Sequence, residues 1–429
     1  MKKNILVIST SPWNDTNSSG NTFSNFFGNW DNTNFYSIFL RQDLPQNLVC
    51  KGYFQITEKQ LVKQLLCQKK AGRTMSKDEI NALEKSLNHI KSRETERKFL
   101  NFFRKNRSYL AIFARELLWK IGRWNNQNLD DFLLQNKFDY VFAFAAEPIY
   151  LQSIVQYCQK KTNAKLFLFF ADDIYTYKSF RPVRLLYKMF LRHSIAKSAK
   201  QADKLYGASI ELCKEYANHF NKEIKLLYKG CEFKHIKSKL SVSTPIKLSY
   251  AGNLYYGRWK VLELIADAVE KINHNGINMI LEIYTTTTIT SELDTALNRG
   301  ESSKVMGEKP YDEIKEILAD SDFVLHVESF GKKEIAKTRL SFSTKIIDCL
   351  QSGSCIMAVG PDSVSSIKYL QKVDGAIVIT ELANIHRVLT DLAENKSQAL
   401  ERAKLTNKYA RHFHEINNVR QHLQADFTH

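Results

Sequence analysis

Short runs of nearly continuous apolar residues alternate along the chain with longer segments that have helical spacing. In the first half these runs cover residues 4–10, 138–146, 164–173 and 204–209. In the second half they cover residues 245–254, 278–285, 303–310, 322–329, 355–359 and 374–380. Strands that are apolar on both faces are typical of parallel sheets covered by helices. The pattern therefore predicts an α/β protein built from doubly wound sheets.

The 429 residues are too many for one ordinary hydrophobic core. The Ser-, Lys- and Pro-containing segment 234–246 has the composition of a linker, and we place a domain boundary there. The prediction is a first domain over residues 1–235 and a second over 246–393, with a C-terminal helix over 394–429 that packs back on the first domain.

The formal net charge of +17 is uneven. Residues 69–123 hold fifteen Lys and Arg against six acids, and residues 178–201 hold seven and no acid. The first window is predicted to be a basic helical insertion, with Phe102, Phe103, Trp119 and Trp124 interleaved among bases that include Arg104, Lys105 and Arg107. Such surfaces favour an anionic membrane face or a lipid-diphosphate acceptor. Nucleic acid is the competing partner, but no recognised nucleic-acid module is present.

The N-terminal apolar run is too short for a signal peptide, and no run approaches the ~18 residues of a membrane-spanning helix. The seven cysteines are scattered without a CxxC pair. These features predict a cytoplasmic protein with reduced thiols.

The stretch LSFSTKIIDCLQSGSCIMAVG begins at Leu340 and combines hydroxyls, a lysine and a carboxylate before a buried strand. Ser341, Ser343 and Thr344 stand where a helix should begin, and they are candidate caps. Lys345 adds a positive charge at a helix start suited to phosphate, and Asp348 shares its face. An ordinary capped helix with a surface ion pair is the alternative.

This stretch resembles the donor-site helix of GT-B-fold glycosyltransferases, particularly bacterial surface-polysaccharide enzymes similar to glycosyltransferase family 4. The resemblance implies two Rossmann-like domains facing a central cleft, and a sugar transfer, with retention, from a nucleotide-diphosphate donor such as a UDP-sugar. It implies that Asp348 binds the ribose hydroxyls. The family's other glutamate falls on Leu340, which cannot accept a hydrogen bond.

The segment AGNLYYGRWK resembles the family's glycine loop followed by two bases that grip the donor diphosphate. Gly252 is then expected to allow close backbone approach, and Arg258 and Lys260 to bind phosphate oxygens. Residues Val305 to Gly307 resemble the nucleobase loop. The resemblance implies no metal ion and no cofactor, because cationic side chains balance the leaving diphosphate.

The loop NSSGN resembles the family's flexible glycine loop near the donor phosphates, with Gly20 as the candidate residue. Asp172, Asp173 and Glu147 end strands of the first domain. They are candidate sugar-binding or basic groups, and strand-exit capping is the alternative role.

We therefore expect a metal-independent hexosyltransferase that acts on a glycan or lipid-linked acceptor in surface-polysaccharide synthesis, at the inner face of the plasma membrane. Because of Leu340, the alternative is a non-catalytic glycosyltransferase-like subunit that binds glycan or a partner enzyme. A nucleotide-cofactor oxidoreductase is disfavoured, since no G-x-G-x-x-G follows the first strand.

Overall fold

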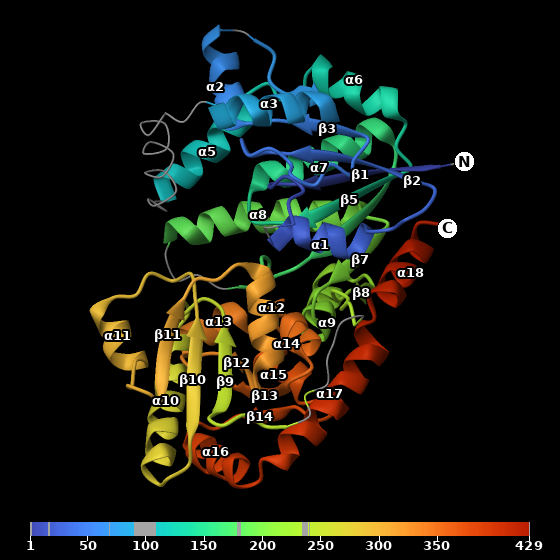
Figure 1. Ribbon diagram of the computed structural model, residues 1–429. Coiled ribbons are helices and arrows are strands. Elements are labelled where there is room, and N and C mark those ends of the chain that lie inside the picture. Colours follow the sequence, from blue (N-terminus) through green and yellow to red (C-terminus); the bar gives the residue numbers. More distant parts are fainter. Residues whose placement is uncertain are drawn as a thin grey trace. The chain divides into compact units, whose positions relative to one another are not determined.

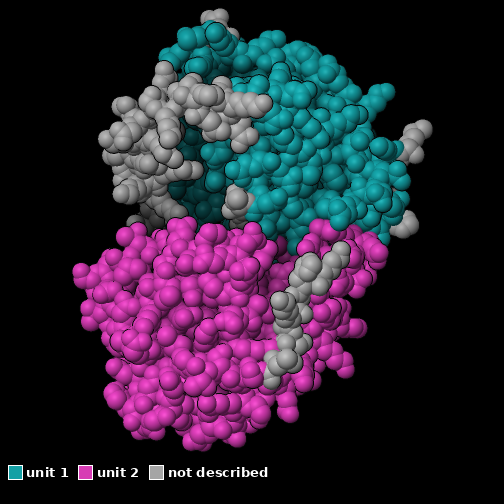
Figure 2. Space-filling model, viewed as in Figure 1, with its two compact units in different colours: residues 1–208, 212–227, 423–429 teal, residues 209–211, 228–422 magenta. Residues whose placement is uncertain are grey.

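The computed structural model describes residues 2–15, 18–67, 69–89, 109–177, 182–233, 239 and 241–428. The chain forms two compact units, coloured separately in Figure 2. Unit 1 comprises residues 1–208, 212–227 and 423–429, and unit 2 comprises residues 209–211 and 228–422. Residues 228–233, which the sequence analysis placed in the first domain, group with unit 2.

Unit 1 is built on an eight-stranded sheet with the order β4-β3-β2-β1-β5-β6-β7-β8 (Figure 1). Each neighbouring pair is parallel except β3 and β4, which are antiparallel. The strands are β1 (Lys3–Ser9), β2 (Thr33–Phe39), β3 (Gly52–Gln55), β4 (Arg73–Met75), β5 (Tyr140–Ala145), β6 (Lys165–Phe170), β7 (Lys204–Gly207) and β8 (Ile224–Leu226). The helices are α1 (Ser18–Phe27), α2 (Glu58–Cys67), α3 (Lys77–His89), α5 (Tyr109–Ile121), α6 (Gln127–Asn136), α7 (Ile149–Thr162), α8 (Pro182–Gln201) and α9 (Ile210–Phe220).

Unit 2 is built on a six-stranded, wholly parallel sheet with the order β11-β10-β9-β12-β13-β14. The strands are β9 (Ile246–Ala251), β10 (Met279–Tyr284), β11 (Ser303–Gly307), β12 (Phe323–Val327), β13 (Cys355–Val359) and β14 (Ile377–Ile379). The helices are α10 (Arg258–His274), α11 (Ser291–Leu297), α12 (Tyr311–Asp320), α13 (Lys332–Thr338), α14 (Lys345–Ser352), α15 (Ser365–Leu370), α16 (Ile385–Glu394), α17 (Ser397–His414) and α18 (Ile416–Asp426), with a short 3₁₀ helix at Leu382–Asn384.

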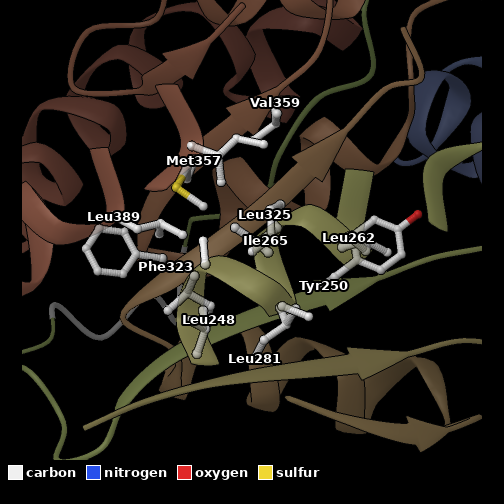
Figure 3. Packing of buried hydrophobic residues seen from close by; sticks show 14 of the residues in the cluster. Leu248, Tyr250, Leu262, Ile265, Leu281, Phe323, Leu325, Met357, Val359 and Leu389 are labelled. Atoms are coloured by element: carbon white, nitrogen blue, oxygen red, sulfur yellow. The ribbon is translucent and has the colours of Figure 1, made fainter. Parts of the chain in front are cut away.

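The core of unit 2 shows why its strands read as continuous apolar runs. Leu248, Leu281 and Phe323 from three neighbouring strands are almost fully buried, and Ile265 of α10 packs against the same cluster (Figure 3). A parallel sheet with helices on both faces hides both sides of each strand, so alternation is lost. The predicted pair of α/β domains with parallel sheets is therefore confirmed.

The polar segment after β1, predicted as a loop, is partly a helix. Phe23, Phe26 and Phe27 of α1 are at most 3% exposed, and their spacing places them on one helix face against the sheet. Burial of these three rings stabilises a helix whose remaining residues are polar. The loop prediction for this segment is wrong.

A segment from the far end of the chain completes the core of unit 1. Phe427 is 2% exposed, and its ring centroid lies 4.5 Å from that of Phe167 and 5.2 Å from that of Trp30. The adjacent Asp426 accepts hydrogen bonds from Lys204 Nζ (2.6 Å) and the Tyr206 hydroxyl (2.8 Å). Residues 423–429 thus belong structurally to the unit that starts the chain.

Residues 90–108 of the predicted basic insertion lie outside the described residues, including Phe102, Phe103, Arg104, Lys105 and Arg107. Its C-terminal part forms α5. Trp119 on α5 is 1% exposed and stacks on Tyr150, with ring centroids 4.3 Å apart. The expectation that Trp119 meets a lipid headgroup boundary is therefore wrong.

Candidate functional site

Lys345 and Gly252, predicted from two separate motifs, meet at the carboxyl end of the unit 2 sheet. Lys345 is the first residue of α14, and Gly252 directly follows β9. A Cβ atom at Gly252 would collide with the Lys345 amine, so only glycine leaves this space open. The amine lies 5.5 Å from the ring centroid of Tyr250, whose hydroxyl points away from the core cluster (Figure 3).

The ammonium of Lys345 has no direct partner within the described residues. Burial and then the neighbouring positive charge of Arg258 lower the pKa of Lys345 to about 8, although the carboxylates of Glu328 and Asp348 act in the opposite direction. Over the part of the chain that the structure describes, no hydrogen-bond acceptor or carboxylate pairs with its ammonium group. A desolvated ammonium without a direct partner is costly, so this arrangement suits an anionic ligand.

Arg258, the first residue of α10, is held by the protein itself. Its Nη2 donates to both carboxylate oxygens of Glu328 at 3.1 and 3.3 Å. Its Nη1 donates to Asn253 Oδ1 at 3.0 Å, and its Nε donates to the Val327 carbonyl at 3.3 Å. A guanidinium has five N–H donors, so these contacts leave one for a ligand. Arg258 was expected to bind phosphate oxygens. The structure leaves it one N–H and its positive charge for that contact.

Glu328 is the acid that holds Arg258, and the pair is buried, with side chains 3% and 12% exposed. His326 Nε2 lies 3.4 Å from Glu328 Oε1. Burial opposes the charged carboxylate, but His326 and Arg258 outweigh it, and the pKa of Glu328 is lowered. Glu328 thus fixes the orientation of Arg258 beside Lys345.

Asp348 lies one turn along α14 from Lys345. Its Oδ1 accepts a hydrogen bond from the Tyr311 hydroxyl at 2.9 Å. Burial raises the pKa of the Asp348 carboxyl, while the Tyr311 hydroxyl and the Lys229 ammonium act in the opposite direction. Asp348 is bonded to Tyr311 on α12, and the structure records no ion pair of the kind that the shared helix face suggested.

The start of α14 is organised by the neighbouring helix α15. Thr344 occupies the N-cap position and is exposed, but its side chain makes no capping bond. The Ser343 amide donates to Ser366 Oγ at 3.0 Å, and Ser366 Oγ donates to the Ser341 carbonyl at 3.3 Å. The capping predicted for Thr344 is therefore wrong, and Ser366 supplies the local contacts. The helix ends before Gly353, which caps it in the left-handed conformation (φ 76°).

The other predicted donor-site residues of unit 2 have contacts of their own, and the structure records none with Lys345 or Arg258. Lys260 is exposed, with its amine 5.4 Å from the ring centroid of Trp259. Val305 and Gly307 belong to β11, where the Val305 amide donates to Asn298 Oδ1 at 2.7 Å. Their proposed roles stay predictions.

In unit 1, Gly20 lies in the first turn of α1. A Cβ atom there would collide with the backbone of Asn14. The glycine therefore permits close approach of the loop after β1 to the helix. A role for Gly20 in donor binding stays a prediction.

The three candidate carboxylates of unit 1 differ in their contacts. Asp173 accepts from the amide and the hydroxyl of Thr176 at 2.8 and 2.6 Å and from the Tyr216 hydroxyl at 2.9 Å, so it shapes the loop after β6. Asp172 and Glu147 are exposed. Asp172 and Glu147 are thus more accessible than Asp173, and a sugar contact of any of the three stays a prediction.

Reasoning from the sequence missed the roles of Glu328, Tyr311 and Lys229. Glu328 directly follows β12, so the rule that ligands gather beyond the carboxyl ends of strands could have found it. Tyr311 and Lys229 approach Asp348 only through the fold, and no local pattern marks them.

Among the described residues, no group of three or more His, Cys, Asp or Glu side chains is placed to hold a metal ion. Within the same residues, no helix combines the length and the apolar character needed to cross a membrane.

Comparisons with known proteins give matches at the level of structure. No protein-family model and no curated protein matches the sequence. The structure of HepE from Anabaena with UDP and glucose is similar, with 11% identity, a TM-score of 0.63 and coverage of 99% of both chains. Sucrose-phosphate synthase from Thermosynechococcus elongatus matches over 100% of this chain and 98% of its own, with 7% identity and a TM-score of 0.62. A UDP-forming α,α-trehalose-phosphate synthase from Burkholderia vietnamiensis matches over 100% of both chains, with 9% identity and a TM-score of 0.60.

These matches span both units of the chain and define its fold class. The protein has the two-domain GT-B fold of glycosyltransferases, which confirms the fold expected from the sequence. At these identities the likeness establishes the fold alone.

Proposed function

We propose that this protein is a glycosyltransferase that transfers a sugar, with retention, from a nucleotide-diphosphate donor to a glycan or lipid-linked acceptor. UDP is the favoured nucleotide, because similar structures were solved with UDP and UDP-glucose. The pathway we propose is synthesis of a bacterial surface polysaccharide.

The observation that carries the proposal is the ammonium of Lys345 beside Gly252, which has no direct hydrogen-bond or ion-pair partner among the described residues. A donor diphosphate would supply the anion that this partly buried cation lacks. Arg258 stands beside it with its positive charge and one N–H. When the bond between the sugar and the diphosphate breaks, negative charge grows on the leaving phosphate. Cations fixed in advance at that position stabilise the transition state more than the bound donor.

Asp348 would accept hydrogen bonds from the two ribose hydroxyls. A carboxylate has enough lone pairs for both, and Tyr311 already orients one of its oxygens. The charge of Lys345 and Arg258 is the basis for proposing a transfer that needs no metal ion.

Unit 1 would supply the acceptor side. The exposed carboxylates of Glu147 and Asp172 are the proposed groups that bind sugar hydroxyls or take up a proton. A lipid-diphosphate acceptor would place the protein on the cytoplasmic face of the plasma membrane, in agreement with the net charge of +17.

Calorimetric titration with UDP, GDP and uridine tests the donor site. Wild type should bind the diphosphates and discriminate against uridine, and Lys345→Ala should lose much of this discrimination. Lys260→Ala tests whether this exposed base takes part. Lys271→Ala is the control, because Lys271 is an exposed base in the last turn of α10, at the opposite end of that helix from Arg258. If Lys345→Ala binds UDP like wild type, the proposed diphosphate site is wrong.

A second candidate function, a non-catalytic glycosyltransferase-like subunit, is favoured by Leu340. This residue, which stands where the resembled family has a glutamate, is 3% exposed and has no polar side-chain atom. Hydrolysis or transfer of a panel of nucleotide sugars by the pure protein separates the two candidates. Nucleotide binding without any turnover across the panel would favour the subunit.

A further inference from the structure

Helix α8 of unit 1, labelled in Figure 1, has several large apolar side chains exposed to solvent. Tyr187, Leu191 and Ile195, spaced four residues apart, are buried against the unit. Helical periodicity places Leu186, Met189 and Phe190 on the opposite side, with Val183 and Leu185 at its two edges. These residues and their exposed fractions are Val183 (47%), Leu185 (48%), Leu186 (48%), Met189 (59%) and Phe190 (57%).

Two of the bases of α8 face inward and anchor the helix. Lys188 is 2% exposed, and its ammonium donates to the Tyr177 carbonyl at 2.8 Å and lies 3.8 Å from the centroid of that ring. Arg192 Nε donates to the Tyr175 carbonyl at 2.6 Å. These cations hold the loop at residues 175–177 and are not available to a partner. The surface position expected for all seven bases of this window is therefore wrong for Lys188, which is buried, while Arg192 is half-buried.

The bases that remain on the outer face lie toward the end of the helix. Lys197 and Lys200 are exposed, as is His193 between them and the apolar residues. Residues 178–201 contain no acid. Along the helix axis, the outer face of α8 is therefore apolar in its N-terminal half and basic in its C-terminal half.

The neighbouring helix α5 has the same combination of side chains. It packs against α8 through Phe113 and Tyr187, whose ring centroids are 6.0 Å apart. Leu117 and Ile121, one turn apart on α5, are 57% and 53% exposed, and Lys120 between them is exposed.

We infer that the outer face of α8 docks on an anionic lipid bilayer. At such a surface the apolar side chains enter the boundary between headgroups and acyl chains, while Lys197 and Lys200 meet phosphate groups. The absence of acids over the whole window removes repulsion from anionic headgroups. This inference rests on the membrane location proposed above and does not depend on which sugar is transferred.

The test is sedimentation of the full-length protein with phosphatidylglycerol and phosphatidylcholine vesicles at low and high salt. Wild type should bind phosphatidylglycerol vesicles and be released by high salt. The combined variant Leu186→Ser, Met189→Ser and Phe190→Ser should lose about tenfold or more of its partitioning into these vesicles. The variant Lys197→Glu and Lys200→Glu should lose the preference for anionic lipid.

Helix α17 of unit 2 offers matched controls. Leu405 and Phe413 are 50% and 55% exposed, and Lys404 and Lys408 are exposed. Changing Leu405 and Phe413 to Ser, or Lys404 and Lys408 to Glu, should leave vesicle binding unchanged. Melting temperature and UDP affinity should match wild type for every variant, which excludes unfolding as the cause.

Two results would overturn the inference. If wild type ignores anionic vesicles at low salt, the docking surface does not exist, whereas sugar transfer to a soluble acceptor would be unaffected. If wild type binds and the α8 variants bind equally, another surface contacts the lipid. Size-exclusion chromatography of the same set adds one further outcome: a dimer that is lost only in the serine variant would show that this face joins two copies of the chain.

Discussion

Lys188 in unit 1 and Lys345 in unit 2 are partly or fully buried lysines with similar pKa values and different surroundings. Burial is the main reason that the pKa of each falls to about 8. The ammonium of Lys188 donates to the Tyr177 carbonyl and lies over the Tyr177 ring. The ammonium of Lys345 lies near Gly252 and Arg258, with no acceptor among the described residues.

The difference shows that a lowered pKa does not by itself mark a ligand site. Both side chains are desolvated, but only at Lys188 does the fold provide the partner that a buried donor needs. At Lys345 a partner must come from outside the described residues. The hydrogen bonds that a charged group makes are therefore more informative about its role than its pKa.

The largest effect is expected at the cation that the fold satisfies most completely, Arg258. Glu328→Ala leaves this arginine buried without its carboxylate, and we expect a loss of about 3–5 kcal/mol in the free energy of unfolding. Urea denaturation followed by circular dichroism measures it. Glu301→Ala, at a side chain that is 91% exposed, is the control and should change little. A Glu328→Ala protein as stable as the control would show that the Arg258 pair does not stabilise the fold.

Alanine at each lysine should separate stability from binding. Lys188→Ala removes a buried hydrogen bond and should cost about 1–3 kcal/mol of stability. Lys345→Ala should preserve stability and weaken UDP binding by about 1–3 kcal/mol, because it removes a charge-assisted contact. Thermal unfolding measures the change in stability of each variant, and calorimetric titration measures the change in its affinity for UDP. If the two variants lose the same amounts of stability and of UDP affinity, the proposed difference between the two lysines is wrong.

The affinity for UDP should depend on pH above 7. In the free protein Lys345 loses its proton as the pH passes about 8. UDP needs the charged form, so its affinity should fall about twofold between pH 7 and 8 and about tenfold between pH 7 and 9. Lys345→Arg keeps its charge throughout and should remove most of this dependence. Identical pH profiles for the two proteins would assign the dependence to another group.

The smallest effect on UDP binding is expected at Asp348, one turn after Lys345 on α14. Asp348→Asn keeps the shape of the side chain but loses its charge, and it should weaken UDP binding by about 1 kcal/mol. Wild type should prefer UDP to 2′,3′-dideoxy-UDP, and the variant should discriminate less. Titrations with both nucleotides test the ribose contact, and unchanged discrimination would remove it.

The sequence predicted long apolar strands well and short or polar elements poorly. β1, β5, β6 and the strands of unit 2 follow the predicted runs, and β1, β5, β6, β12 and β13 are buried along almost their whole length. β2 was missed because Asn34 and Ser37 interrupt its apolar run. β8 has three residues, too few for a pattern. The single C-terminal helix expected from residue 394 is divided into α17 and α18 at Glu415, where the Ile416 amide donates to the Cys231 carbonyl at 3.0 Å, a contact that no local pattern indicates.

For the candidate site, the sequence identified which residues carry charge but not which of them the fold uses. Lys345 and Gly252 were predicted separately and meet in the structure. The bonding of Arg258 by Glu328 and of Asp348 by Tyr311 involves residues 70 and 37 positions away, respectively, so neighbouring sequence carries no trace of it.

The position of Phe427 has a consequence for the order of events during synthesis. Most of unit 1 emerges from the ribosome before unit 2, and N-terminal domains generally begin to fold as they emerge. The ring of Phe427, which contacts Trp30 and Phe167, is synthesised only after all of unit 2. The first unit to be translated is thus the last to be finished, and until then its sheet presents an open aromatic surface to the cell.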